Sequence, residues 1–102
     1  MQVKITVLKK EFYADYADEF LTEGSAAGAC PELEVGDEFV YEGGAVMPEG
    51  FCPYAWIDLY PSICSLMGGR DLTNTWYKNP KTKLLCCTDG VRPVLFRLEQ
   101  IG

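Results

Sequence analysis

Hydrophobic and polar residues alternate along residues 2–9, a pattern typical of a β-strand with one buried face. The inward side chains of this predicted strand are Val3, Ile5 and Val7. A second strand is expected between a turn at Val35-Gly36-Asp37 and the pair Gly43-Gly44, because glycine marks turns and breaks in regular structure.

Apolar residues recur at helical spacing in two other segments. Residues 12–22 predict a short helix whose inward face is made by Phe12, Tyr16, Phe20 and Leu21. A second helix is expected to begin at Cys52-Pro53 and to end at Gly68-Gly69, because proline is favoured at the first helical position and glycine just after the last. Its predicted buried stripe consists of Cys52, Trp56, Leu59, Ile63 and Leu66.

Pro61 interrupts the second predicted helix. A proline inside a helix removes one hydrogen bond and clashes with the preceding turn. We therefore expect either a kink near residues 57–59 or two short helices in tandem. On an ideal helix, Asp58 faces away from the stripe that begins at Cys52.

The C-terminal part of the chain predicts a β-hairpin. Two apolar runs, residues 83–88 and 93–100, flank the dipeptide Asp89-Gly90. Such a dipeptide between apolar runs is a strong signal for a tight type I′ turn. In that register, Leu85 lies opposite Val94.

The same register constrains the two adjacent thiols. Cys87 lies opposite Arg92, and successive side chains of a strand point to opposite faces. Cys86 and Cys87 therefore cannot both face the core, so that one is packed and the other is presented near Arg92. Pro93 has no N–H to donate, so we expect an edge strand or a bulge at this position.

The order of elements is strand, helix, strand, helix and hairpin. This order predicts an α+β fold: a mostly antiparallel sheet of about four strands, with both helices packed on one face. A chain of 102 residues, 48% of them hydrophobic, is long and apolar enough for one domain, residues 1–102.

The distribution of charge along the chain limits the classes of function that the protein can have. The net charge is −6, and residues 11–69 contain twelve acidic residues and no basic one. Sequence-independent nucleic-acid binding depends on Lys and Arg, so the balance argues against it. The chain has no histidine, which excludes Ser-His-Asp and Cys-His catalysis and histidine-ligated metals.

The N-terminal ten residues alternate like a strand and do not have the layout of a secretion signal. No apolar run approaches the roughly 20 residues of a membrane-spanning helix. These features predict a cytoplasmic protein with no membrane contact, whose five cysteines are reduced thiols.

Two stretches, residues 50–58 (GFCPYAWID) and residues 86–94 (CCTDGVRPV), resemble the signatures of a family of small, uncharacterised prokaryotic proteins common in anaerobes. The resemblance extends over nearly the whole chain and implies no established activity. The positions that match its pattern are Cys30, Cys52, Trp56, Asp58, Cys86, Cys87, Asp89, Gly90 and Arg92. Cys64 does not belong to the pattern and is assigned to helix packing.

Three functions remain open. The first is a binding or accessory module with a Cys/Asp/Arg cluster, in which Trp56, Trp76 and Tyr77 line a pocket or a protein contact or simply pack in the core. Its partner would be a small molecule, another protein or a second copy of the chain.

The second function is a thiol site that binds zinc or iron or undergoes redox chemistry, assembled from Cys30, Cys52 and one of Cys86 or Cys87. The third is an enzyme with a cysteine nucleophile acting on a small anion. In that case Cys52 or Cys87 attacks, Asp58 or Asp89 is the base, and Arg92 holds the anion.

Arg92 is expected to reach a carboxylate in any of these cases, with Asp58 preferred over Asp89. We expect the pair to be at least partly buried. Arg92→Met would then lower stability by more than the roughly 0–1 kcal/mol of an exposed ion pair.

Overall fold

The computed structural model of this protein describes residues 1–69 and 75–102. In chain order, the elements are β1 (Gln2–Lys10), α1 (Ala14–Phe20), the 3-10 helix η1 (Gly24–Ala27), β2 (Glu38–Tyr41), α2 (Pro53–Met67), β3 (Thr82–Cys86) and β4 (Val94–Ile101). They confirm the predicted α+β class. In the described part of the chain, no helix combines the length and the apolar character that crossing a membrane requires.

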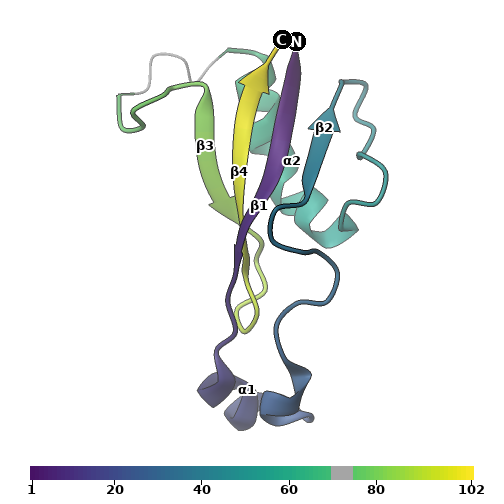
Figure 1. Cartoon of the computed structure of the whole chain (residues 1–102), viewed down its shortest axis with the longest axis vertical. Coiled ribbons are helices and arrows are strands. Elements are labelled where there is room, and N and C mark those ends of the chain that lie inside the picture. The colour runs from purple at the N-terminus through teal and green to yellow at the C-terminus, as the bar shows by residue number, and fades with distance from the viewer. Residues whose placement is uncertain (70–74) are drawn as a thin grey trace.

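The sheet is antiparallel throughout, with strand order β2-β1-β4-β3 (Figure 1). The first and last strands of the chain are therefore its central pair. Ile5 pairs with Leu98 and Val7 with Phe96, so apolar side chains of the two strands adjoin on one face. This face is buried, as predicted for β1, and its fully buried residues are Val3, Ile5, Val7, Val94, Phe96 and Leu98.

α2 covers the apolar face and contacts β1, β3 and β4. Its buried residues are Ala55, Leu59, Ile63 and Leu66. The predicted buried stripe is therefore confirmed for Leu59, Ile63 and Leu66. Cys52 and Trp56, which were also predicted to be buried, are half-buried at its margin. At the C-terminal end, the Gln100 side-chain amide donates to the Leu66 carbonyl at 2.9 Å, which links the helix to β4.

α2 continues through Pro61 as one helix, so the prediction of two tandem helices is wrong. Pro61 removes the donor that would otherwise reach the Ile57 carbonyl. Ile57 lies on the exposed side of the helix, where water can hydrate that carbonyl. The packing of the opposite side against the sheet holds the helix together across the interruption.

α1 differs from the prediction in length and in surroundings. It is shorter than the helix expected over residues 12–22. Among the described helices and strands, it contacts η1 alone. Figure 1 shows it beyond the end of the sheet, so the expectation that both helices pack on the sheet is wrong. Tyr16 and Phe20, expected to face the core, are 54% and 72% exposed. Helical spacing identifies residues that share one side of a helix, but not whether another element lies against that side.

β3 and β4 form the predicted hairpin with a longer loop, residues 87–93. Leu85 pairs with Phe96, two residues from the expected Val94. Neither Asp89 nor Gly90 has the positive φ angle that a type I′ turn requires, so the predicted turn and register are wrong.

Pro93 lies just before β4, which is a central strand and not the expected edge strand. Because Pro93 precedes the paired residues, its missing N–H costs no hydrogen bond of the sheet. Its carbonyl accepts a hydrogen bond from the Glu11 N–H at 2.9 Å. The irregularity in this part of the sheet falls on β1 instead, as a register shift between Val7 and Lys9.

Two substitutions on α2 test this packing. Leu59 is fully buried, whereas Ile57 is 72% exposed. We expect Leu59→Ala to lower the free energy of unfolding by about 2–5 kcal/mol, because it leaves a cavity between helix and sheet. Ile57→Ala, the matched control, should change it by less than about 0.5 kcal/mol. Urea denaturation followed by circular dichroism measures both, and equal effects would contradict this placement of α2.

Candidate functional site

A cavity of about 310 Å³ lies between the hairpin loop and the N-terminal end of α2. The residues that line it are Cys30, Glu32, Leu33, Cys52, Tyr54, Ala55, Asp58, Cys87, Thr88, Asp89, Arg92, Val94 and Phe96. Six of these are residues that the sequence singled out: Cys30, Cys52, Asp58, Cys87, Asp89 and Arg92. They come from three separate segments, so only the tertiary structure brings them together.

Cys52 and Asp58 reach the cavity from the same element. Cys52 is the N-cap of α2 and has an extended backbone, with φ −75° and ψ 122°. Its side chain therefore does not follow the helical spacing on which the sequence argument depended. Asp58, expected to face away from Cys52, lines the same cavity, and that expectation is wrong.

Asp58 anchors the hairpin loop to α2. Its Oδ2 accepts a hydrogen bond from the backbone N–H of Thr88 at 2.9 Å. The Thr88 hydroxyl lies 3.2 Å from Oδ1 and 3.1 Å from Oδ2 of the same carboxylate. Both oxygens are thus engaged, and the bonds join two segments 30 residues apart in sequence. The sequence places Thr88 at the end of the predicted strand 83–88, and nothing in it indicates this role.

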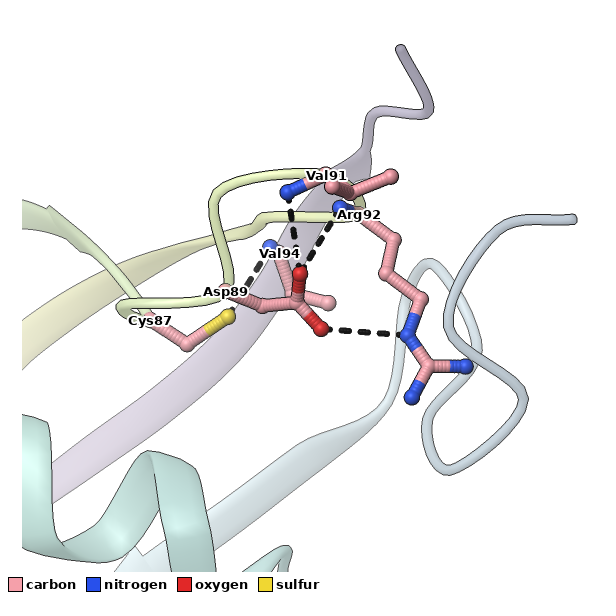
Figure 2. Close-up of polar contacts among 5 residues, drawn as sticks. All are labelled: Cys87, Asp89, Val91, Arg92 and Val94. Carbon is pink, nitrogen blue, oxygen red and sulfur yellow. Dashed lines mark hydrogen bonds and ion pairs between the residues drawn. The ribbon is translucent and has the colours of Figure 1, made fainter. Parts of the chain in front are cut away.

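Asp89 organises the loop from within (Figure 2). Its Oδ1 accepts hydrogen bonds from the backbone N–H groups of Val91 and Arg92, both at 3.0 Å. Its Oδ2 accepts one from Nε of Arg92, also at 3.0 Å. Burial acts to raise the pKa of Asp89, but the N–H groups of Arg92 and Val91 and the Arg92 guanidinium outweigh it, so the net pKa is lowered.

Arg92 therefore pairs with Asp89, and the preference for Asp58 is wrong. Asp58 is already held by Thr88. The side chains of Arg92 and Asp89 are each 39% exposed. An ion pair this exposed contributes about 0–1 kcal/mol, so the large stability loss expected for Arg92→Met does not follow. Hydrogen bonding to Asp89 raises the pKa of Arg92, which keeps the guanidinium charged.

The terminal nitrogens of Arg92 point away from Asp89 (Figure 2). Across residues 1–69 and 75–102, neither nitrogen forms a hydrogen bond to the protein. The Glu32 carboxylate also acts to raise the pKa of Arg92, and both Glu32 and Cys30 lie near the guanidinium. Arg92 thus presents unused donors beside a cavity that contains thiols.

The two adjacent cysteines lie on opposite faces, as predicted. Cys86 is exposed and pairs with Leu95 across the strands. Cys87 is half-buried against the core and lines the cavity, so the packed thiol is also the one near Arg92. Its sulfur accepts a hydrogen bond from the Val94 N–H at 3.3 Å, where a regular strand pair would use a carbonyl (Figure 2).

The remaining singled-out residues lie elsewhere. Trp56 packs against Tyr60, with ring centroids 4.9 Å apart, beside the core. Trp76 is 84% exposed, and the Tyr77 hydroxyl bonds to the backbone of Leu84 on β3. None of these aromatic residues lines the cavity. Cys64, assigned to helix packing from the sequence, is exposed, so that assignment is wrong.

All five cysteines are free thiols. Three of them, Cys30, Cys52 and Cys87, line the cavity. In the described residues, no group of three cysteine or acidic side chains is arranged as a metal-binding site. Glu32 and Tyr54 also contribute to the cavity wall. Glu32 lies in no motif, and Tyr54 lies within residues 50–58 but is not one of the positions that match the pattern.

Comparisons of the chain with protein-family models, with curated proteins and with solved structures find no match.

The Asp89 carboxylate predicts an acid-dependent loss of stability. Its pKa is lower in the folded protein than in the unfolded chain, where it is about 3.9. Ionised Asp89 therefore stabilises the fold above about pH 4, and this contribution is lost as the pH falls through the lower folded value. Asp89→Asn should lower the free energy of unfolding at pH 7 by no more than about 1 kcal/mol, because the group is half exposed.

The difference between Asp89→Asn and the parent should shrink as the pH falls below about 4, because the parent carboxyl then becomes protonated as well. Urea denaturation of both proteins at a series of pH values from about 7 downward measures this difference. A difference that stays constant over the whole range would show that the charge of Asp89 does not stabilise the loop.

Proposed function

We propose that this protein is a small binding module whose ligand occupies the cavity between the hairpin loop and the N-terminal end of α2. The observation that carries the proposal is the convergence of Cys30, of Cys52 and Asp58, and of Cys87, Asp89 and Arg92 on that cavity. Concave sites with a few convergent polar groups and apolar walls are typical of small-molecule sites.

The cavity limits the ligand in size and chemistry. Its volume of 310 Å³ is at the lower end of the range of roughly 300–1,000 Å³ that is typical of ligand pockets, which favours a small molecule. Its apolar wall is made by Leu33, Ala55, Val94 and Phe96. The unused nitrogens of Arg92 would donate to an acceptor group on the ligand, such as a carboxylate or a carbonyl.

The carboxylates of the cavity favour binding over catalysis. Both oxygens of Asp58 accept hydrogen bonds from Thr88, and those of Asp89 accept them from the loop backbone and Arg92. A general base must be free to take a proton, and the chain has no histidine to serve instead. The two acids that the sequence offered as bases thus have structural roles.

The same proposal includes no nucleic-acid partner, for which the acidic composition is the support. The cytoplasmic location and the reduced state of the thiols there stay predictions. Membership in the family of small prokaryotic proteins stays a prediction that rests on residues 50–58 and 86–94.

A ligand in the cavity should shield its three thiols. We expect compounds selected from a metabolite library by thermal shift to slow iodoacetamide labelling of Cys30, Cys52 and Cys87. The exposed Cys64 and Cys86 lie outside the cavity and should react at unchanged rates. At a concentration near 100 times the Kd, such a compound should stabilise the fold by about 2.7 kcal/mol. Mass spectrometry of the labelled peptides gives the five rates separately.

Arg92→Gln and Arg97→Gln form a matched pair for the same compounds. Their side chains are similarly exposed, at 39% and 36%, but Arg97 lies on β4 beside Thr6 and Glu99, outside the cavity. Binding should weaken in Arg92→Gln alone. Compounds that stabilise the protein while the three cavity thiols react as before would contradict the proposal.

A second candidate function, thiol redox chemistry, is favoured by the three thiols that line one cavity. Hydrogen peroxide would oxidise two of these thiols to a disulfide and be reduced to two molecules of water. This function differs from ligand binding because it needs a change in covalent structure.

Limited peroxide treatment distinguishes the two functions. If the cavity is a redox site, the intact protein loses about two mass units and the bridged peptides contain two of Cys30, Cys52 and Cys87. Dithiothreitol should reverse the change. A bridge that involves Cys64 or Cys86, or oxidation confined to single sulfenic and sulfinic acids, would exclude a redox role for the cavity.

A further inference from the structure

The unit formed by α1 and η1, here called the α1–η1 tip (residues 13–27), stands apart from the rest of the fold. Among the described helices and strands, α1 contacts η1 alone, and Figure 1 shows both at the far end of the long axis of the molecule. The tip is nevertheless well attached. The Tyr13 N–H donates to the Val91 carbonyl of the hairpin loop at 2.8 Å. Within the tip, the Ser25 N–H donates to the Asp18 carboxylate at 2.6 Å, which links η1 to α1.

One side of α1 is aromatic and faces solvent. Tyr13 is the N-cap residue of α1, and Tyr16 and Phe20, four residues apart in the helix, share one side of it. Their exposed fractions are 42%, 54% and 72%. Leu21, at 37%, continues the apolar surface toward the hairpin loop. Exposed apolar residues that gather on one side of an element often mark a contact with another molecule.

The charge around this surface selects the kind of partner. Residues 11–27 contain five acidic residues and no basic one. Asp15, Glu19 and Glu23 are exposed beside the aromatic residues. A second copy of the tip would bring these acids against their own counterparts, which like-charge repulsion disfavours. A segment that carries lysine or arginine together with apolar side chains complements both the charge and the aromatic surface.

A second cavity adjoins the aromatic surface. It has a volume of about 330 Å³ and is lined by Leu21, Thr22, Glu23, Ala27, Asp89, Val91 and Arg92. Asp89 and Arg92 are already paired with each other. Within residues 1–69 and 75–102, Glu23 makes no hydrogen bond or ion pair through its side chain, so its carboxylate can receive a cation. Leu21, Ala27 and Val91 provide apolar walls for the aliphatic stem of a lysine or arginine.

We propose that the α1–η1 tip docks a basic, amphipathic segment of a partner protein. Apolar side chains of that segment cover Tyr16 and Phe20, and one lysine or arginine enters the second cavity toward Glu23. This interaction goes beyond the small-molecule site, because it uses a different cavity and an outer surface of the molecule.

Selection from a randomised 12-residue peptide display library on the immobilised full chain tests the proposal. The selected peptides should combine Lys or Arg with aromatic or aliphatic residues. Fluorescence anisotropy with one synthesised peptide should show binding that weakens with added salt. Phe20→Ser should weaken it by about tenfold or more, because the central aromatic contact is lost. Glu23→Gln should weaken it less and reduce its salt dependence.

Ile57→Ser is the matched control, because Ile57 on α2 is 72% exposed, as is Phe20. It should leave the Kd within about twofold, a difference too small to represent a lost contact. Circular dichroism shows that each variant is folded.

Several outcomes would overturn the proposal. One is the absence of any enriched peptide, another the enrichment of acidic peptides, and a third is binding that survives Phe20→Ser. A concentration-dependent dimer in sedimentation velocity that Phe20→Ser dissolves would assign the surface to a second copy. Phe20-dependent binding to phosphatidylcholine vesicles containing phosphatidylserine would assign it to a lipid surface.

Discussion

Burial of one face of the β1–β4 strand pair beneath α2 is the constraint on which the rest of the structure depends. Removal of apolar surface from water is the dominant favourable contribution to folding, and the fully buried side chains of this protein concentrate in this layer. Once α2 lies across the sheet, its N-terminal end is next to the hairpin loop. Asp58 can then bond to Thr88, and the thiols of three segments come to one cavity. The site is thus a product of the core and not of any local motif.

The central strands and α2 could be predicted because their apolar residues are spaced for one buried face. The register of the hairpin could not be predicted, because the Asp89 carboxylate accepts hydrogen bonds from two backbone N–H groups of the loop. The dipeptide Asp89-Gly90 by itself does not indicate that arrangement. The register error was two residues, which equals the side-chain period of a strand. Each side chain therefore lies on its predicted face of the sheet. The prediction that Cys86 and Cys87 lie on opposite faces was right, although the residues predicted to pair with them were wrong.

Two other predictions failed because the sequence does not show what surrounds a residue. The helical spacing of Tyr16 and Phe20 was genuine, but α1 extends past the end of the sheet, where η1 alone among the described helices and strands contacts it. Asp58 was assigned the wrong direction relative to Cys52 because Cys52 precedes the helix in an extended conformation. The residues of the cavity could be named from the sequence more readily than their contacts, because contacts depend on how the segments meet.

Asp89 and Arg92 form a wall that is common to both cavities. Any substitution at either position alters two surfaces at once, so a cellular phenotype is pleiotropic and does not assign the effect to one of them, whereas a binding measurement with a defined compound does. Separation-of-function alleles must come from residues that border a single cavity. Cys52 serves for the cavity next to α2, and Leu21 for the cavity next to η1.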